Sequence, residues 1–287
     1  MPAEFSLPRI LAPHRRGTGD PAFRVTADGA IWRASYTPDG PAWVRLRKSG
    51  PDIDAGTGGP GAGWLLDSVP GMLGLRDDAT GFEPAHPFLV EAARRVPDLR
   101  IGHTNRVFEA LVPAVLEQKV VGVEARRAWR LLLHKYGEKT PVSGLVVPPP
   151  PSVWQRIPSW QWHRAGVEAV RARTIITAAR IADRLEGQGS AETDRRLRAL
   201  TGIGVWTSAE IRQRSHGDPD AVSVGDFHLA RTVGWTLERR IVDDAEMLQI
   251  LQPYAGHRFR ATRLIELLGE RPPPRGPKLP ARDYRRI

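Results

Sequence analysis

The most informative stretch of the chain reads LRALTGIGVWTSA, from Leu197 to Ala209. Its apolar spacing predicts a helix, a Gly-Ile-Gly turn and a second helix over residues 197–214. Gly202 and Gly204 allow backbone conformations that other residues avoid, and Ile203 is placed to fill the core between the two helices. The turn also leaves unpaired N–H groups at the start of the second helix, where a phosphate can bind. On Gly-Ile-Gly alone, a plain helix–turn–helix corner would fit as well.

An acidic residue follows this turn about twenty positions later. The apolar run Ala221 to Val224 leads into Gly225-Asp226-Phe227-His228-Leu229. Taken alone, Asp226 would be the N-cap of a helix. Together, the turn and the acid resemble the helix-hairpin-helix/Gly-Pro-Asp superfamily of base-excision DNA glycosylases. The resemblance implies that Asp226 is the catalytic aspartate and that the hairpin residues bind DNA, namely Gly202, Ile203, Gly204 and Thr207.

The resemblance extends along most of the chain, from Arg24 to Leu268. The segments 96–101, 108–112 and 116–121 are similar to DNA-3-methyladenine glycosylase II, the alkylation-repair branch. By that similarity, Gln118 and Lys119 match the loop that fills the base stack when a nucleotide is flipped out, and Tyr254 matches a second aromatic of the base pocket.

Two positions depart from the family pattern. Lys119 stands where the family usually has an apolar residue, so attraction to the DNA backbone would partly replace stacking. Glu210 stands where an aromatic residue lines the pocket in the best-known relative. A carboxylate there could favour cationic bases, but we expect Glu210 to face solvent.

Trp206 separates branches of the superfamily. The bifunctional branch has a lysine at this position, whose amine attacks the sugar and cleaves the strand through a Schiff base. A tryptophan cannot do this, so the resemblance implies a monofunctional enzyme in which water attacks. Its indole would also suit the base pocket, because a ring face attracts a cationic alkylated purine by ~0.5–2 kcal/mol. Without the resemblance, Trp206 would fit an ordinary core position equally well.

The expected fold class is α+β and mainly α. Residues 1–103 are predicted to form a small N-terminal domain with an antiparallel β-sheet, because 23–47 alternates between apolar and polar residues around Asp28-Gly29 and Pro38-Asp39-Gly40 turns. The glycine-rich stretch 50–63 is expected to be a flexible surface loop. Residues 104–268 show helical periodicity and are expected to form a two-lobed, all-helical glycosylase domain. Residues 269–287 form a basic tail that is expected to be unpacked and to attract phosphates.

Composition restricts the chemistry. The 287 residues contain no Cys, which excludes disulfides, thiolate zinc sites, iron–sulfur clusters and cysteine nucleophiles. No His/carboxylate spacing indicates a metal, and no cofactor is expected. The family resemblance implies only that hairpin carbonyls could hold a monovalent cation.

The net charge of +10 and the pI near 10.7 favour a polyanionic partner. No leader pattern or membrane span of ~18 apolar residues is visible. We therefore expect a cytoplasmic, nucleoid-associated protein that acts on double-stranded DNA. Without a long apolar heptad pattern, it is expected to be a monomer.

The sequence therefore predicts a monofunctional DNA glycosylase that flips and hydrolytically excises alkylated purines from duplex DNA, of the 3-methyladenine and 7-methylguanine type, and so initiates base excision repair. Two alternatives remain open. The chain could excise another lesion, such as uracil or an oxidised purine, or it could be a noncatalytic helix-hairpin-helix DNA-binding protein.

Overall fold

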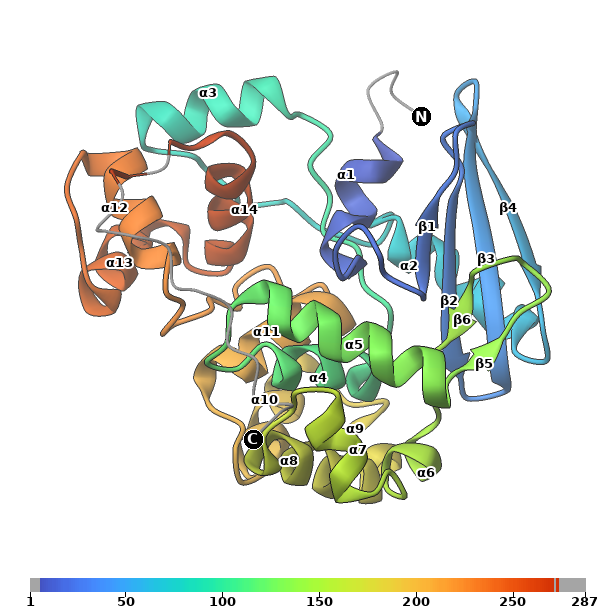
Figure 1. Ribbon diagram of the computed structural model, residues 1–287. Helices are drawn as coiled ribbons and strands as arrows, with labels where there is room; N and C mark the ends of the chain where they lie inside the picture. Colours follow the sequence, from blue (N-terminus) through green and yellow to red (C-terminus); the bar gives the residue numbers. More distant parts are fainter. Residues whose placement is uncertain (1–5, 271, 274–287) are drawn as a thin grey trace.

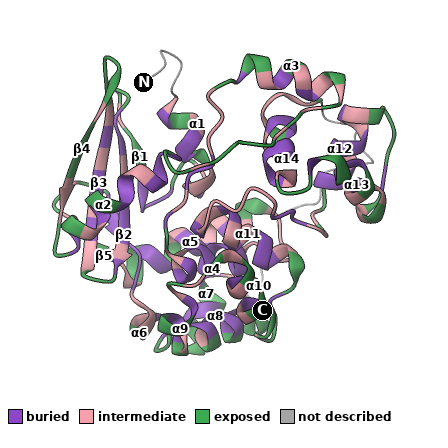
Figure 2. Ribbon diagram, turned by 180° about the vertical axis from the view of Figure 1, so that it is seen from behind, coloured by how far each residue is buried: buried purple, intermediate pink, exposed green. Residues whose placement is uncertain are grey.

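The structure is a computed structural model that describes residues 6–270 and 272–273. An antiparallel sheet with two small helices lies on one side, a group of helices from α4 to α11 lies beneath it, and a second helical group lies on the other side (Figure 1). Buried residues concentrate on the facing sides of these elements (Figure 2). The mainly helical α+β fold predicted from the sequence is therefore confirmed.

The N-terminal sheet has the strand order β1-β2-β3-β4, with every pair antiparallel. Its elements are α1 (Leu7–Leu11), η1 (Ala12–His14), β1 (Phe23–Val25), β2 (Ile31–Thr37), β3 (Gly40–Ser49), β4 (Asp52–Gly58) and α2 (Ala62–Met72). Alternation along β3 turns Ala42, Val44 and Leu46 inward. These side chains pack in one core with residues of α1 and α2.

The expectation of a flexible loop over 50–63 is wrong, because 52–58 forms the edge strand β4. Most of its side chains are exposed, so the strand depends on backbone pairing with β3 and leaves almost no apolar pattern. Gly58 lies opposite Trp43, and a Cβ atom at this glycine would approach the indole to 2.4 Å. One of the glycines that suggested a loop, Gly58, thus makes room for an aromatic residue.

The first helical lobe is built around α4, the most buried helix of the group. Its core includes a row of stacked indoles, with ring centroids 6.5 Å apart for Trp129–Trp154 and 5.8 Å apart for Trp154–Trp162. The elements of this lobe are α4 (Val107–Leu116), α5 (Gly122–Tyr136), β5 (Glu138–Lys139), β6 (Val146–Val147), α6 (Pro151–Trp154), α7 (Ser159–Arg164), α8 (Ala169–Arg180), α9 (Ala182–Leu185), α10 (Ser190–Arg198) and α11 (Val205–Ser215).

The second lobe combines segments that are distant in the sequence. Helix α3 (Pro87–Arg95) packs against α12 (Leu229–Glu238) and α14 (Arg258–Leu268), and its buried Leu89 and Ala92 belong to the same core. Helix α13 (Asp244–Ile250) and η2 (Gln252–Tyr254) complete the lobe. The domain boundary expected after residue 103 therefore separates α3 from the helices that it packs against. Most of the predicted tail, 269–287, lies outside the described residues.

No helix in the described ranges combines the length and apolar character that a membrane span needs.

Candidate functional site

The predicted hairpin connects α10 to α11. Gly202 has a φ of 92°, and a Cβ atom at this position would lie 2.2 Å from the Thr174 hydroxyl oxygen, so only glycine fits here. Ile203 is buried in the core of the first lobe, as its position predicts. Gly204 is the N-cap of α11 and provides no side-chain cap. The first-turn N–H groups of α11 are thus left to solvent or to a bound anion.

Gln118 ties the end of α4 to this hairpin. Its side-chain amide donates to the Gly202 carbonyl and to the Thr207 hydroxyl, both at 2.8 Å. Thr207 is buried, so its hydroxyl forms its hydrogen bond inside the protein and is not exposed at the surface. Lys119, the next residue, is exposed and has a left-handed φ of 52°. Lys119 is thus held at the tip of a turn whose base is fixed by Gln118.

Trp206 and Asp226 meet across the start of α11. The indole Nε1 donates to Asp226 Oδ2 at 3.2 Å, although the two residues lie 20 positions apart. The other carboxylate oxygen, Oδ1, accepts from the backbone N–H groups of His228 and Leu229 at 2.8 and 3.0 Å. Asp226 therefore binds the backbone where α12 begins, but the N-cap of that helix is His228, and not Asp226 as the simpler interpretation predicted. Both residues are only half-buried, and Oδ2 keeps a lone pair beyond its bond to the indole.

Tyr254 lies in a different environment from Trp206. It is 2% exposed within the core of the second lobe. Its hydroxyl accepts from the backbone N–H of His86 at 3.0 Å and contacts the His86 ring, while its own ring lies 6.0 Å from Phe82. Both the polar and the apolar part of Tyr254 are thus used inside the lobe. The predicted place in a base pocket gains no support from these contacts, and Tyr254 is a core residue.

The expectation that Glu210 faces solvent is wrong. One carboxylate oxygen accepts from the Ser223 hydroxyl at 2.6 Å, and the other accepts from the Arg214 guanidinium at 2.7 Å. Burial by itself would raise the pKa of Glu210, but the charge of Arg214 and the Ser223 hydrogen bond outweigh it, and the pKa is lowered. Because Arg214 balances its charge, Glu210 does not act as an isolated negative group that would attract cationic bases.

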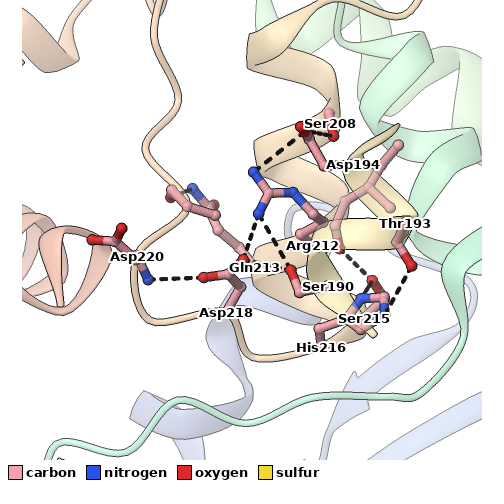
Figure 3. Close-up of polar contacts among 12 residues, drawn as sticks. Ser190, Thr193, Asp194, Ser208, Arg212, Gln213, Ser215, His216, Asp218 and Asp220 are labelled. Atoms are coloured by element: carbon pink, nitrogen blue, oxygen red, sulfur yellow. Dashed lines mark hydrogen bonds and ion pairs between the residues drawn. The ribbon is translucent and has the colours of Figure 1, made fainter. Parts of the chain in front are cut away.

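Other polar side chains, which the sequence pattern did not indicate, hold the segment that leads to Asp226. Arg212 of α11 donates to Asp218 at 2.5 Å and to Ser190 at 3.2 Å (Figure 3). The buried Gln213 donates to the Ala221 carbonyl at 2.8 Å and to the Ser223 hydroxyl at 2.9 Å. We call residues 217–226 the acid segment, because they run from the end of α11 to Asp226. Its Asp218-Pro219-Asp220 sequence is the only signal that could have indicated these anchors.

Asp220 fixes the acid segment to the second lobe. Its carboxylate accepts from Arg258 Nε at 2.7 Å and from the backbone N–H of Gly256 at 2.9 Å. Burial raises the pKa of Asp220, but hydrogen bonds and charge from Arg258 reverse the effect, and the pKa is lowered. The acid segment is therefore anchored to α11 on one side and to the start of α14 on the other.

Exposed residues flank the acid. Phe227 is 74% exposed, and its ring meets that of His228 edge-on with centroids 4.8 Å apart. The described residues include no cluster of three or more His, Asp or Glu side chains that could hold a metal ion. The carbonyls of Thr201 and Gly202 each accept one hydrogen bond and keep a second lone pair. A monovalent cation on these carbonyls stays a prediction.

The chain is similar in sequence and in fold to known proteins. No family model matches the chain. A probable bifunctional transcriptional activator/DNA repair enzyme AlkA from Mycobacterium tuberculosis is 34% identical over 167 residues, which is 54% of this chain. The chain spans only about a third of that relative's length, since the match covers 33% of it. This match supports the resemblance to alkylation-repair glycosylases.

Solved structures share the whole fold. A 3-methyladenine DNA glycosylase from Archaeoglobus fulgidus has a TM-score of 0.73 at 17% identity, over 90% of this chain and 93% of the other. An 8-oxoguanine glycosylase/lyase from Clostridium acetobutylicum has a TM-score of 0.70 at 12% identity, over 91% and 92%. The fold is that of the helix-hairpin-helix DNA glycosylases.

Proposed function

We propose that this chain is a monofunctional DNA glycosylase that flips alkylated purines out of duplex DNA and releases them by hydrolysis, the first step of base excision repair. The observation that carries the proposal is the contact between Trp206 and Asp226 at the start of the hairpin's second helix. A noncatalytic DNA-binding protein has no need to aim a carboxylate at the surface where phosphates would bind. The relative named as a DNA repair enzyme supports the same function.

DNA binding would use the exposed side of the hairpin. The uncapped start of α11 offers N–H groups to a backbone phosphate, and a monovalent cation on the hairpin carbonyls would add positive charge there. Lys119 extends from its turn toward the same strand or into the gap that a flipped nucleotide leaves. Flipping costs a few kcal/mol, and less where pairing is already weakened.

Asp226 would then act on the sugar. Its Oδ1 is occupied by two backbone N–H groups, which fix the carboxylate, while Oδ2 remains partly open beside Trp206. This oxygen stabilises the oxocarbenium-like sugar as the glycosidic bond breaks, and orients the water that attacks C1′. An alkylated purine is already cationic, so it departs without a strong acid. The Trp206 indole has no amine to form a Schiff base, which makes hydrolysis without strand cleavage the expected outcome.

The test is base release from methylated duplex DNA, measured by chromatography for the wild type and for Asp226→Asn. We expect the wild type to release 3-methyladenine and 7-methylguanine, and the variant to release them at least about 100-fold more slowly. Equal release by both proteins, or none by the wild type, would refute the proposal. Intact strands after release distinguish hydrolysis from lyase chemistry.

A binding experiment separates the enzyme from a noncatalytic binder. Both would lose affinity as salt rises, because phosphate contacts dominate both. Only the glycosylase should prefer a duplex with an abasic-site analogue over the undamaged duplex, since phosphate contacts carry no such information. Equal affinity for the two duplexes would favour the binder. Parallel assays with uracil and 8-oxoguanine duplexes test the other lesions, and we expect little release from either.

A further inference from the structure

Glu210 occupies a position that connects the N-terminal region with the acid. It lies four residues after Trp206 on α11, so both side chains project from the same face of the helix. Trp206 contacts Asp226, and Glu210 contacts Ser223, three residues earlier in the acid segment. One face of α11 therefore holds both ends of the turn from Ser223 to Asp226.

The same turn is closed by its own backbone. The N–H of Asp226 donates to the Ser223 carbonyl at 3.1 Å. Ser223 is 5% exposed, and its hydroxyl donates to Glu210 and accepts from Gln213. Because the Ser223 side chain is held on two sides, its carbonyl is fixed in place, and the N–H of Asp226 is fixed with it.

Arg214 extends this chain of contacts to the N-terminal region. Its guanidinium donates to Glu210 from Nη1 and to the Pro13 carbonyl from Nε at 3.0 Å. The backbone carbonyl of Arg214 accepts from Thr104, in the segment that enters the first lobe. The arginine therefore orients Glu210 and also keeps its buried charge balanced.

We propose that Glu210 is a positioning residue for Asp226: held by Arg214, it fixes Ser223 and thereby the turn that places the acid against Trp206. This inference rests on the proposed function only for its kinetic consequence. A purely structural ion pair between Glu210 and Arg214 would stabilise the fold without affecting the acid more than the rest of the molecule. The two roles predict different flexibility of the backbone at residues 226–229 when Glu210 is replaced.

The first experiment is amide hydrogen exchange on the full chain without DNA. We expect Glu210→Ala to speed exchange at Asp226, His228 and Leu229, because the first is bonded to Ser223 and the others to the Asp226 carboxylate. Glu192→Ala is the control, because Glu192 also pairs with an arginine four residues later, at 2.6 Å, but on α10. Exchange at these amides that is unchanged in Glu210→Ala, or equally raised in the control, would overturn the proposal.

The second experiment is single-turnover base release beside affinity for a duplex with an abasic-site analogue. We expect Glu210→Ala to lower the release rate about 10- to 100-fold, as a misplaced reacting group does, while the dissociation constant changes less than about threefold. Glu210→Gln should recover part of the rate, since its amide oxygen still accepts from Ser223 although its NH2 group replaces the oxygen that accepts from Arg214. Wild-type rates in Glu210→Ala, a loss explained by affinity alone, or no recovery in Glu210→Gln would overturn the positioning role.

Ser223→Ala covers the case in which Glu210→Ala does not fold. It removes the same contact without leaving a buried charge unpaired, and should show the same local exchange and the same slower release. Full protection and a full rate in this variant would overturn the proposal. A wild type that releases no base would refute the proposed function instead, and hydrogen exchange would still decide whether Glu210 positions the acid.

Discussion

Two regions of the molecule near Glu210 differ in whether their polar groups are buried and paired or exposed to solvent. The domain junction, where the sheet meets the first lobe, buries charged side chains and pairs them; it comprises His14, Arg16, Arg33, Glu109 and Arg214. The acid rim does the opposite and exposes its residues to solvent; it comprises Lys119, Gly202, Gly204, Phe227 and His228. The comparison indicates that the junction contributes to stability, whereas the rim is available for a ligand.

The arginines of the junction are held in ion pairs within the protein. Arg33 forms an ion pair with Glu109, which also accepts from the Ser35 hydroxyl. A cavity of about 30 Å³ remains between these groups, and the buried Nε2 of His14 lacks a hydrogen-bond partner there. A space of this size holds one or two waters, which is a way to satisfy such an atom.

The largest effect is expected from breaking the junction's ion pair. Arg33→Ala leaves the carboxylate of Glu109 buried without its partner, which should lower the free energy of unfolding by about 3–5 kcal/mol in denaturant titrations. The matched control is Arg47→Ala, because the pair Arg47–Asp54 is exposed and should contribute only about 0–1 kcal/mol. Similar losses in the two variants would contradict the distinction between junction and surface.

A substitution at Phe227 tests whether the acid rim contacts DNA. We expect Phe227→Ala to weaken binding to a duplex with an abasic-site analogue by about 1–3 kcal/mol, the range for stacking of a base on an aromatic side chain, without lowering the melting temperature. Val170→Ala on α8 is the control, since Val170 is also apolar and exposed, at 57%. A loss of stability with unchanged DNA affinity would place Phe227 with the core instead.

The junction also predicts a pH dependence. Burial, followed by the charges of Arg33 and Arg214, holds the pKa of His14 well below its usual value. Below about pH 6.5 the unfolded chain binds a proton at His14 that the folded chain does not bind. The free energy of unfolding is therefore highest above pH 6.5 and falls by about 1.4 kcal/mol for each pH unit below it. His103 and His216 shift in the same direction. In His14→Gln, unfolding free energies between pH 7 and pH 5.5 should fall less steeply; an unchanged slope would contradict the assignment.

The smallest effect concerns Lys119. If it contacts a phosphate, Lys119→Ala should weaken binding to all duplexes alike and lower the slope of log affinity against log salt by about 1. Titrations at several salt concentrations measure that slope. A variant that instead loses only the preference for the abasic analogue would place the lysine inside the duplex, in the space of the flipped nucleotide.

The sequence predicted the hairpin and the approach of Asp226 to it, because both depend on short stretches of chain. Gly202 allows the left-handed turn that other residues avoid, and Ile203 fills the core beside it. Glu210 was misjudged, and the contacts of Tyr254 were not foreseen, because the surroundings of both come from residues elsewhere in the chain. Ser223 approaches Glu210 only through the path of the acid segment, and His86, which binds the Tyr254 hydroxyl, lies 168 positions before it. The edge strand β4 could not be predicted, because a strand held by backbone pairing alone needs no alternation of apolar and polar residues.

The placement of α3 has a consequence for synthesis. The apolar face of Leu89 and Ala92 is synthesised before the first lobe, but the helices that cover it, α12 and α14, are made only after that lobe. The sheet and first lobe are complete at Ser215 and can fold while α3 is still uncovered. A nascent chain of this protein thus carries an unprotected apolar helix until α12 and α14 have been made, and a chain that ends before Leu229 keeps that helix uncovered.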